Sequence, residues 1–297
     1  MFVLQAPIVA YDSLGLEANL SVSQRGSSMK RYAATLKQHL GHYAGERLGV
    51  QEHGIYNGRR YAHILPARLR YLNLLEPVRA ELQAYLKAHP GIKEHQFFHH
   101  LNSSQAFTFN LFYPYFVEGG TTARILAKSL GVDAEVDAWE FEAVLDKDEG
   151  TNVDVLWTTV DGARIFCEVK LSENKFGPAK NDARHQKKLT DIYKPRLLSL
   201  VSDELLVPMT FFKHYQILRN ISLLAERNAD RLVFLMPREN ETLSGPLNRV
   251  LASIEAGAKR RVHIAYIEDC IDDLETAGGL PDPLRVYSSA LKEKYVI

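Results

Sequence analysis

Apolar and polar residues alternate along residues 136–171, and a period of two is the pattern of β-strands with one buried face. Two clusters of turn-forming residues, KDEG at 147–150 and DG at 161–162, divide this alternation into three runs. The segment therefore predicts a three-stranded antiparallel meander. Two later runs, RLVFLMP at 231–237 and RVHIAYIED at 261–269, predict further strands, and the first of these is apolar enough to be fully buried.

The first third of the chain has the spacing of helices. Residues 28–44 predict one helix, and residues 66–88 predict helical structure that Pro77 breaks, since proline interrupts the helical hydrogen-bond ladder. The tripeptide HPG at 89–91 follows and is typical of a boundary between structural units.

Helical spacing also surrounds the predicted meander. An aromatic-rich helix follows Ser103 and Ser104, either of which can cap it, and a short helix is predicted over residues 121–131. Residues 208–228 are helical by spacing and precede the strand at 231–237. A helix followed by a buried strand favours a crossover into the same sheet.

On each strand of the meander, side chains two positions apart share a face. The apolar faces, which we expect to meet in the core, comprise Trp139, Phe141, Ala143 and Leu145, then Val153, Val155 and Trp157, then Ile165, Cys167, Val169 and Leu171. The opposite faces carry Glu140 and Glu142 on the first strand, Asp154 on the second, and Glu168 and Lys170 on the third.

The register of the strands follows from these faces. The apolar faces of the second and third strands coincide only if paired residue numbers sum to an even value such as 322, which places Asp154 opposite Glu168. A three-residue loop over 160–162 gives this sum and puts Gly162 at the left-handed position of a G1 bulge. The same parity between the first two strands, with a sum of 296 or 298, places Glu142 at or near Asp154.

The charges balance over the whole chain but not locally. The 297 residues include 36 basic and 36 acidic ones, which argues against a protein that coats nucleic acid through a basic excess. Residues 133–154 nevertheless hold nine acids and one lysine, while residues 1–90 carry 11 basic and 6 acidic side chains and residues 170–196 carry 8 and 3. Exposure to solvent alone explains most of the individual charges. The more specific interpretation is that the acidic segment binds a cation and that the two basic segments contact phosphates.

Cysteine content and hydropathy bear on the compartment. Cys167 and Cys270 provide neither a disulfide framework nor a zinc spacing, so we expect reduced, packed thiols. No stretch approaches the roughly 20 apolar residues that cross a bilayer, and the initial MFVLQAPIVAYDSLG lacks the basic region of a secretion signal. We therefore expect a cytoplasmic protein with no membrane segment.

Three carboxylates and one lysine are thus predicted to converge on one face of the sheet. Crowded carboxylates repel one another, and burying them is costly unless a cation neutralises them. Oxygen ligands from Asp154, Glu168 and Glu142, with the Val169 carbonyl, suit Mg²⁺ or Mn²⁺ rather than zinc. With the ammonium of Lys170 nearby, such a site can activate a water and stabilise charge on a phosphate, as metal-assisted phosphodiester hydrolysis requires.

The motif order GTNVD, strand, DG turn, strand, FCEVK resembles that of the PD-(D/E)xK nuclease superfamily. The segments HHLNSSQAFTFNLF, TNVDVLW, EVKLSENKFG and HYQILRN together resemble a bacterial restriction-endonuclease-like family within it, over roughly residues 95–240. The resemblance implies an α/β (α+β) fold, in which a mixed central sheet is flanked by helices in the order α-β-β-β-α-β. We expect a mainly helical N-terminal extension over residues 1–90 and the nuclease-like domain over residues 91–297.

The resemblance also implies which residues are catalytic. Asp154 matches the aspartate of the motif, with Val153 in place of the usual proline, and Glu168 and Lys170 match its ExK. The superfamily usually carries a further acid on the helix before the sheet, but the short helix predicted here has none. Two acids therefore stay open as the third metal ligand, Glu142 and Glu118.

Other polar residues are candidates for supporting roles. The residues expected to contact nucleic acid are Lys175, Lys180, Arg184, Lys187 and Lys188. In the nuclease interpretation Gln216 and Arg219 approach the metal site or the DNA backbone, and ordinary helix-surface polarity is the alternative. The segment Ser103, Ser104 and Gln105 could support the site, although capping alone explains the serines. We expect His99, His100 and His214 to be packed or surface residues, because they lack a metal-binding spacing.

The sequence therefore predicts an endonuclease that depends on Mg²⁺ or Mn²⁺ and hydrolyses DNA. One alternative is a non-catalytic nucleic-acid-binding protein of the same fold, and another is an interaction scaffold that uses the acidic block for protein contact. The choice between DNA and RNA, the cleavage specificity and the formation of a homodimer stay open.

Overall fold

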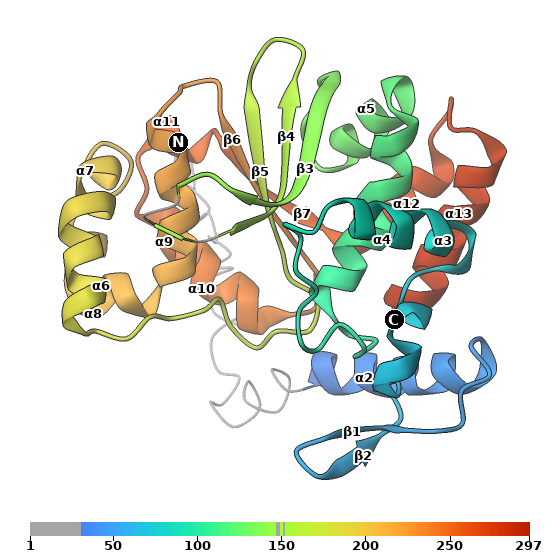
Figure 1. The fold of residues 1–297 in the computed structure, drawn as a ribbon. Helices are drawn as coiled ribbons and strands as arrows, with labels where there is room; N and C mark the ends of the chain where they lie inside the picture. The colour runs from blue at the N-terminus through green and yellow to red at the C-terminus, as the bar shows by residue number, and fades with distance from the viewer. Residues whose placement is uncertain (1–30, 147–148, 151) are drawn as a thin grey trace, which may run out of the picture.

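A five-stranded mixed sheet forms the centre of the computed structural model, which describes residues 31–146, 149–150 and 152–297 (Figure 1). Its order is β3-β4-β5-β6-β7. The strands are β3 (Val136–Val144), β4 (Asn152–Thr159), β5 (Arg164–Val169), β6 (Arg231–Met236) and β7 (Val262–Tyr266). The first three are antiparallel neighbours, and β6 and β7 continue the sheet in parallel. The predicted meander and the crossover into the same sheet are thus confirmed.

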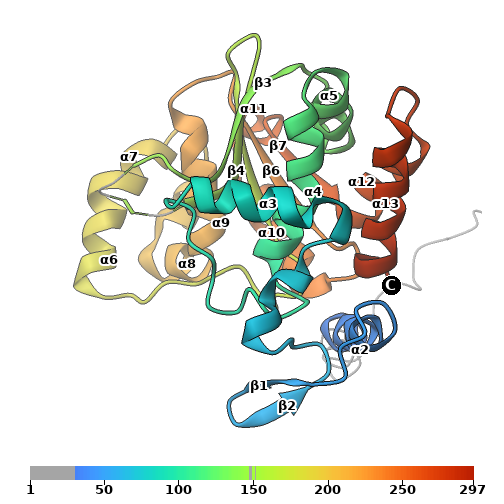
Figure 2. The ribbon, with the colours of Figure 1, turned by 45° about the vertical axis from the view of Figure 1, so that its right-hand side comes forward.

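Helices cover both faces of the sheet (Figures 1 and 2). The first core lies between the sheet and α4 (Ser104–Glu118), α5 (Gly120–Ser129), α12 (Ile267–Thr276) and α13 (Asp282–Tyr295), with α2 (Arg31–Glu46) and α3 (Glu76–Ala88) packed outside them. The second core lies under α7 (Lys194–Leu197), α8 (Pro208–Lys213), α9 (Tyr215–Ser222), α10 (Glu241–Ala252) and α11 (Ala256–Lys259). The short helix α6 (Ala183–Lys188) precedes α7 and has no buried residue. The order from α5 to β6 is the one that the resemblance implied.

Short elements connect these layers. They are the hairpin strands β1 (Gly54–Tyr56) and β2 (Arg59–Tyr61), the 3₁₀ turns η1 (Ala67–Asn73), η3 (Asp203–Leu206) and η4 (Leu223–Ala225), and the π-helical turn η2 (Leu189–Tyr193). Both cysteines are buried free thiols, as expected. No helix within the described residues is long and apolar enough to cross a bilayer.

Most of the predicted helices are present with shifted ends. The helix predicted over 28–44 is α2, and residues 28–30 lie outside the described residues. Pro77 does not break a helix but sits in the first turn of α3, where a missing N–H costs nothing. The side chain of Ser103 caps α4, accepting a hydrogen bond from the Ala106 N–H.

Two other predictions needed correction. The helix predicted over 208–228 is divided at His214 into α8 and α9. The strand predicted over 261–269 ends at Tyr266, where α12 begins.

Residues 31–90 do not have a core of their own. Leu36 and Leu40 of α2 and Leu82 of α3 belong to the same buried cluster as Tyr287 and Leu291 of α13. The segment also contains the hairpin β1–β2, which the sequence did not predict. The division at residue 90 stays a prediction.

The predicted register of the meander is confirmed. Val155 pairs with Cys167 on one side, which gives the sum 322, and with Phe141 on the other, which gives 296. Gly162 has a φ of +84°, in a three-residue loop closed by a hydrogen bond from the Thr159 N–H to the Ala163 carbonyl. The KDEG turn is described only in part, because residues 147 and 148 lie outside the described residues.

Two of the expected core positions are wrong. Leu145 lies beyond the end of β3 and is 39% exposed. Val153 is buried but belongs to the second core rather than the first. The pairing of β4 with β5 ends at Val155, so the strands no longer run as a regular ladder where Val153 lies. The alternation of apolar and polar residues continues through Val153, so the sequence does not show where the ladder ends.

Glu142 marks a second irregularity at the same end of the sheet. Its φ is +54°, a left-handed conformation that a Cβ disfavours, near the end of β3. Its neighbours Phe141 and Ala143 pair with Val155 and Val153, which gives the predicted sum of 296, but Glu142 itself is not paired with Asp154 in the ladder. Such strain persists only where surrounding contacts fix it, and it is concentrated at functional sites.

The strain at Glu142 is testable by comparing two substitutions that remove the same side-chain contacts. Glu142→Gly should be more stable to urea unfolding than Glu142→Ala by about 1 kcal/mol, because only alanine retains the Cβ that opposes a positive φ. At Glu140, two residues earlier on the same strand and without a positive φ, glycine should be the less stable of the two. A Glu142→Ala protein as stable as Glu142→Gly would contradict the strained conformation.

Candidate active site

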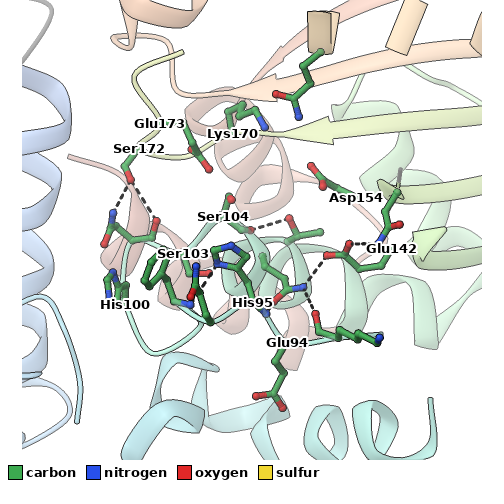
Figure 3. Close-up of a pocket in the computed structure, with 18 residues that line it drawn as sticks. Glu94, His95, His100, Ser103, Ser104, Glu142, Asp154, Lys170, Ser172 and Glu173 are labelled. Atoms are coloured by element: carbon green, nitrogen blue, oxygen red, sulfur yellow. Dashed lines mark hydrogen bonds between the residues drawn. The ribbon is translucent and has the colours of Figure 1, made fainter. Parts of the chain in front are cut away.

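A cavity of about 910 Å³ opens where β4 begins, β5 ends and α4 begins (Figure 3). One side carries the charged residues Glu142, Asp154, Lys170 and Glu173. The other side is formed by the loop before α4, and Ser104 and Gln105 in the first turn of that helix lie between the two. The cavity therefore brings together four of the predicted site residues, Glu142, Asp154, Lys170 and Gln216, whereas neither Glu168 nor Arg219 lines it.

Asp154 bridges the gap between the two diverging strands. Its Oδ2 accepts a hydrogen bond of 2.7 Å from the backbone N–H of Val169, on the strand that β4 has left. Among the described contacts its second oxygen, Oδ1, has no partner, and the side chain lines the cavity. Burial, and after it the charge of Glu168, raises the pKa of Asp154 well above its usual value. A cation placed here would relieve that penalty.

Glu168 is buried, with 3% of its surface exposed, and its carboxylate is held by four donors. Three come from α9, namely Gln216 Nε2 at 2.6 Å, Asn220 Nδ2 at 2.8 Å and Arg219 Nη2 at 3.3 Å, and the fourth is the ammonium of Lys170. Burial by itself raises the pKa of Glu168, but the charges of Lys170 and Arg219 outweigh it and hold that pKa below its usual value. Glu168 is therefore a fixed negative charge.

Lys170 lies between the acids and the cavity. Its ammonium forms an ion pair with Glu168 Oε1, and only 12% of its side chain is exposed. Burial lowers the pKa of Lys170, but the charges of Glu168 and Asp154 overcome that effect and raise the pKa above its usual value. The side chain is consequently a cation at neutral pH and faces the same cavity as Asp154.

The two candidates for a third acid differ in position. Glu142 lines the cavity, where its Oε1 accepts 2.7 Å from Gln105 Nε2 and its Oε2 accepts 3.1 Å from Asn152 Nδ2. Glu118 lies at the far end of α4, roughly 20 Å along the helix, and does not line the cavity. Within the described ranges, however, no three Asp, Glu, His or Cys side chains are grouped closely enough to hold a metal by themselves.

The donor set nevertheless fits a hard divalent cation. The cavity is lined by four acids, Glu94, Glu142, Asp154 and Glu173, and by two lysines, Lys93 and Lys170, so acids outnumber lysines by two. The available ligand atoms are oxygens, including Asp154 Oδ1 and the carbonyl of Val169 at the end of β5. Such sites favour Mg²⁺ or Mn²⁺, with waters completing the coordination.

The basic residues after β5 divide into two groups. Lys175, Lys180 and Arg184 are exposed and have no ion-pair partner in the described part of the chain. Lys187 is paired with Asp191, and Lys188 donates to the Glu149 carbonyl and is mostly buried. This segment runs beside the cavity, because the Gly177 N–H donates to Gln216 Oε1 and the Gln216 N–H donates back to the Gly177 carbonyl.

Sequence reasoning missed the roles of Asn220 and Asn152, and it named Gln105 only as a residue that could support the site. Asn220 holds Glu168, and its i, i+4 spacing from Gln216 was a usable signal. Gln105 and Asn152 hold Glu142, and no local pattern indicated these contacts. His99 and His214 do not line this cavity, but His100 does.

Comparison with known proteins gives one match. No curated protein and no solved structure matches the chain. A family model described as "Restriction Endonuclease associating with ARP" matches residues 37–296, which include the whole sheet, both helical layers and every residue of the cavity. The match and the fold agree, and the chain belongs to this restriction-endonuclease-like family.

Proposed function

We propose that this protein is an endonuclease of the PD-(D/E)xK type that hydrolyses DNA with Mg²⁺ or Mn²⁺. The observation that carries the proposal is that Asp154 and Lys170 line one cavity, with one oxygen of Asp154 left open and Lys170 paired with the buried Glu168. The restriction-endonuclease-like family supports a nuclease and DNA as its substrate. The family description also names an association with ARP, and we propose the same association for this chain.

The chain's own groups have separable roles in this proposal. Asp154, Glu168 and the Val169 carbonyl hold the cation, which when bound lowers the pKa of a water and neutralises charge on the phosphate. Lys170 donates hydrogen bonds to the attacking water and to the phosphate. It acts as a cation rather than a general base, because its pKa is held above the usual value.

The α9 side chains act through Glu168. Gln216 and Asn220 hold one carboxylate oxygen each, and Arg219 supplies a second positive charge. These contacts keep Glu168 ionised and fixed in direction, which a metal ligand requires. Gln216 also lines the cavity, so it lies within reach of a bound strand.

Removing either central carboxylate tests the proposed chemistry. Asp154→Asn and Glu168→Gln should each lower the rate of plasmid nicking in Mg²⁺ by roughly a hundredfold or more, because each loses a charged ligand while keeping its shape. Asp137→Asn, an exposed acid on β3 outside the cavity, is the matched control and should cleave normally. Full activity in either site variant would refute the mechanism.

Lys170 should separate catalysis from binding. Lys170→Met keeps the aliphatic stem but removes the ammonium that we place on the water and the reacting phosphate. Its cleavage rate should fall far more than its DNA affinity measured in EDTA. A parallel fall in both quantities would make Lys170 a binding residue and remove its catalytic role.

The exposed basic residues after β5 should contact phosphates. Lys175→Ala, Lys180→Ala and Arg184→Ala should each weaken duplex binding and reduce the slope of log affinity against log salt by roughly 0.9. Lys259→Ala on α11 lies outside the cavity and the segment beside it, and should leave the slope unchanged. Unchanged slopes in all three variants would show that the segment is a solvated surface.

A further inference from the structure

The side of the cavity opposite Asp154 and Lys170 is largely aromatic. His95, Phe97 and His100 line it, and Tyr56 of β1 packs behind them; we call these four residues the aromatic wall. Phe97 lies 4.9 Å from His100 at an interplanar angle of 32°, and its ring centroid is 5.3 Å from that of Tyr56 and 5.2 Å from that of His95. Figure 3 shows His95 and His100 on this side, with Asp154 and Lys170 on the other.

The wall is poorly suited to holding phosphates. Burial, and then the neighbouring charge of His99, lowers the pKa of His100 to about 4, so its ring is neutral at pH 7. Lys93 is the one lysine among the described residues that line this side. Two lining side chains also keep unused hydrogen-bonding capacity, since His100 Nε2 and Asn102 Oδ1 are buried without a partner in the described chain.

The wall is held at a fixed place relative to the acids. The Gln105 amide accepts from the His95 N–H at 2.7 Å and donates to Glu142 Oε1 at 2.7 Å and to the Lys93 carbonyl at 3.0 Å. The fully buried Asn73 donates to the carbonyl of His100 at 2.7 Å. The two sides of the cavity are therefore preorganised as one site.

We propose that the aromatic wall receives an unpaired base of the strand whose phosphate lies at Asp154 and Lys170. The rings of Phe97 and His100 offer stacking faces to any base, and the cavity is within the size range of small-molecule sites. A base within an intact helix is stacked and paired, so it reaches such a wall only after leaving the stack. The substrate class is therefore single-stranded or locally unpaired DNA. This inference rests on the proposed function, because it takes the stacked strand to be the cleaved one.

Binding in EDTA tests the wall without cleavage. The probes are two fluorescein-labelled strands of equal length and phosphate number, one of thymidines and one wholly abasic. The protein should bind the thymidine strand roughly tenfold more tightly by fluorescence anisotropy. Phe97→Leu, which keeps an apolar side chain without a stacking face, should lose this preference and retain the salt slope. Phe97→Trp should keep the preference.

A matched control and the cleavage assay separate the alternatives. Tyr61→Leu is the matched control, because Tyr61 lies in the β1–β2 hairpin that also carries Tyr56 but contacts His63 outside the cavity. This variant should still prefer the thymidine strand. Equal affinity of the unmodified protein for both strands, no binding of either, or a preference that survives in Phe97→Leu would overturn the proposal. Base preference without plasmid cleavage would refute the proposed hydrolysis and leave the wall in place. Cleavage without base preference would do the reverse.

Discussion

Two carboxylates, Asp154 and Glu168, lie near each other in a largely buried part of the sheet, and the local structure is organised around the cost of keeping both there. An ionised carboxylate is costly to bury unless it is paired and hydrogen-bonded, and removal of one partner from such a group is strongly destabilising. Glu168 meets this constraint with donors from α9 and from Lys170, which directly follows β5. The ionised state of Glu168 consequently depends on the position of α9 over the second core, since no other described helix supplies a donor to this carboxylate.

The irregularities of the sheet are concentrated at the same end. The residues of β4 that precede Val155 are not paired with β5. The carboxylate of Asp154 accepts the hydrogen bond from the Val169 N–H that a backbone carbonyl would accept in a regular ladder. Glu142 adopts a left-handed conformation directly across from this point. In an unbroken ladder the Val169 N–H would donate to a backbone carbonyl of β4, and the Asp154 carboxylate would lose this donor. The departures from regular geometry therefore create the opening that the cavity occupies.

The sequence predicted the part of this arrangement that depends on period-two alternation. The faces of β3 to β5, the sum of 322 and the loop at Gly162 all follow from where apolar side chains must point. Leu145 and Val153 were wrong because alternation continues in the sequence after the regular ladder has ended. The contact of Gln105 with Glu142 joins residues 37 positions apart, and no local pattern carries such information. The same holds for the aromatic wall, whose four rings come from a hairpin and a loop that the sequence left unassigned.

Family membership and fold limit the function without deciding it, because one fold supports many chemistries and chemistry resides in the site. The two carboxylates differ in a way that bears on this choice. Every oxygen of Glu168 is engaged by a donor, as in an ion pair that serves stability alone. Asp154 is engaged through one oxygen and presents the other to a cavity lined by four acids and two lysines. A purely structural acid pair would have no reason to leave that oxygen open beside a strained Glu142 and a lysine kept charged. The divalent-cation site that we propose rests on this open oxygen of Asp154.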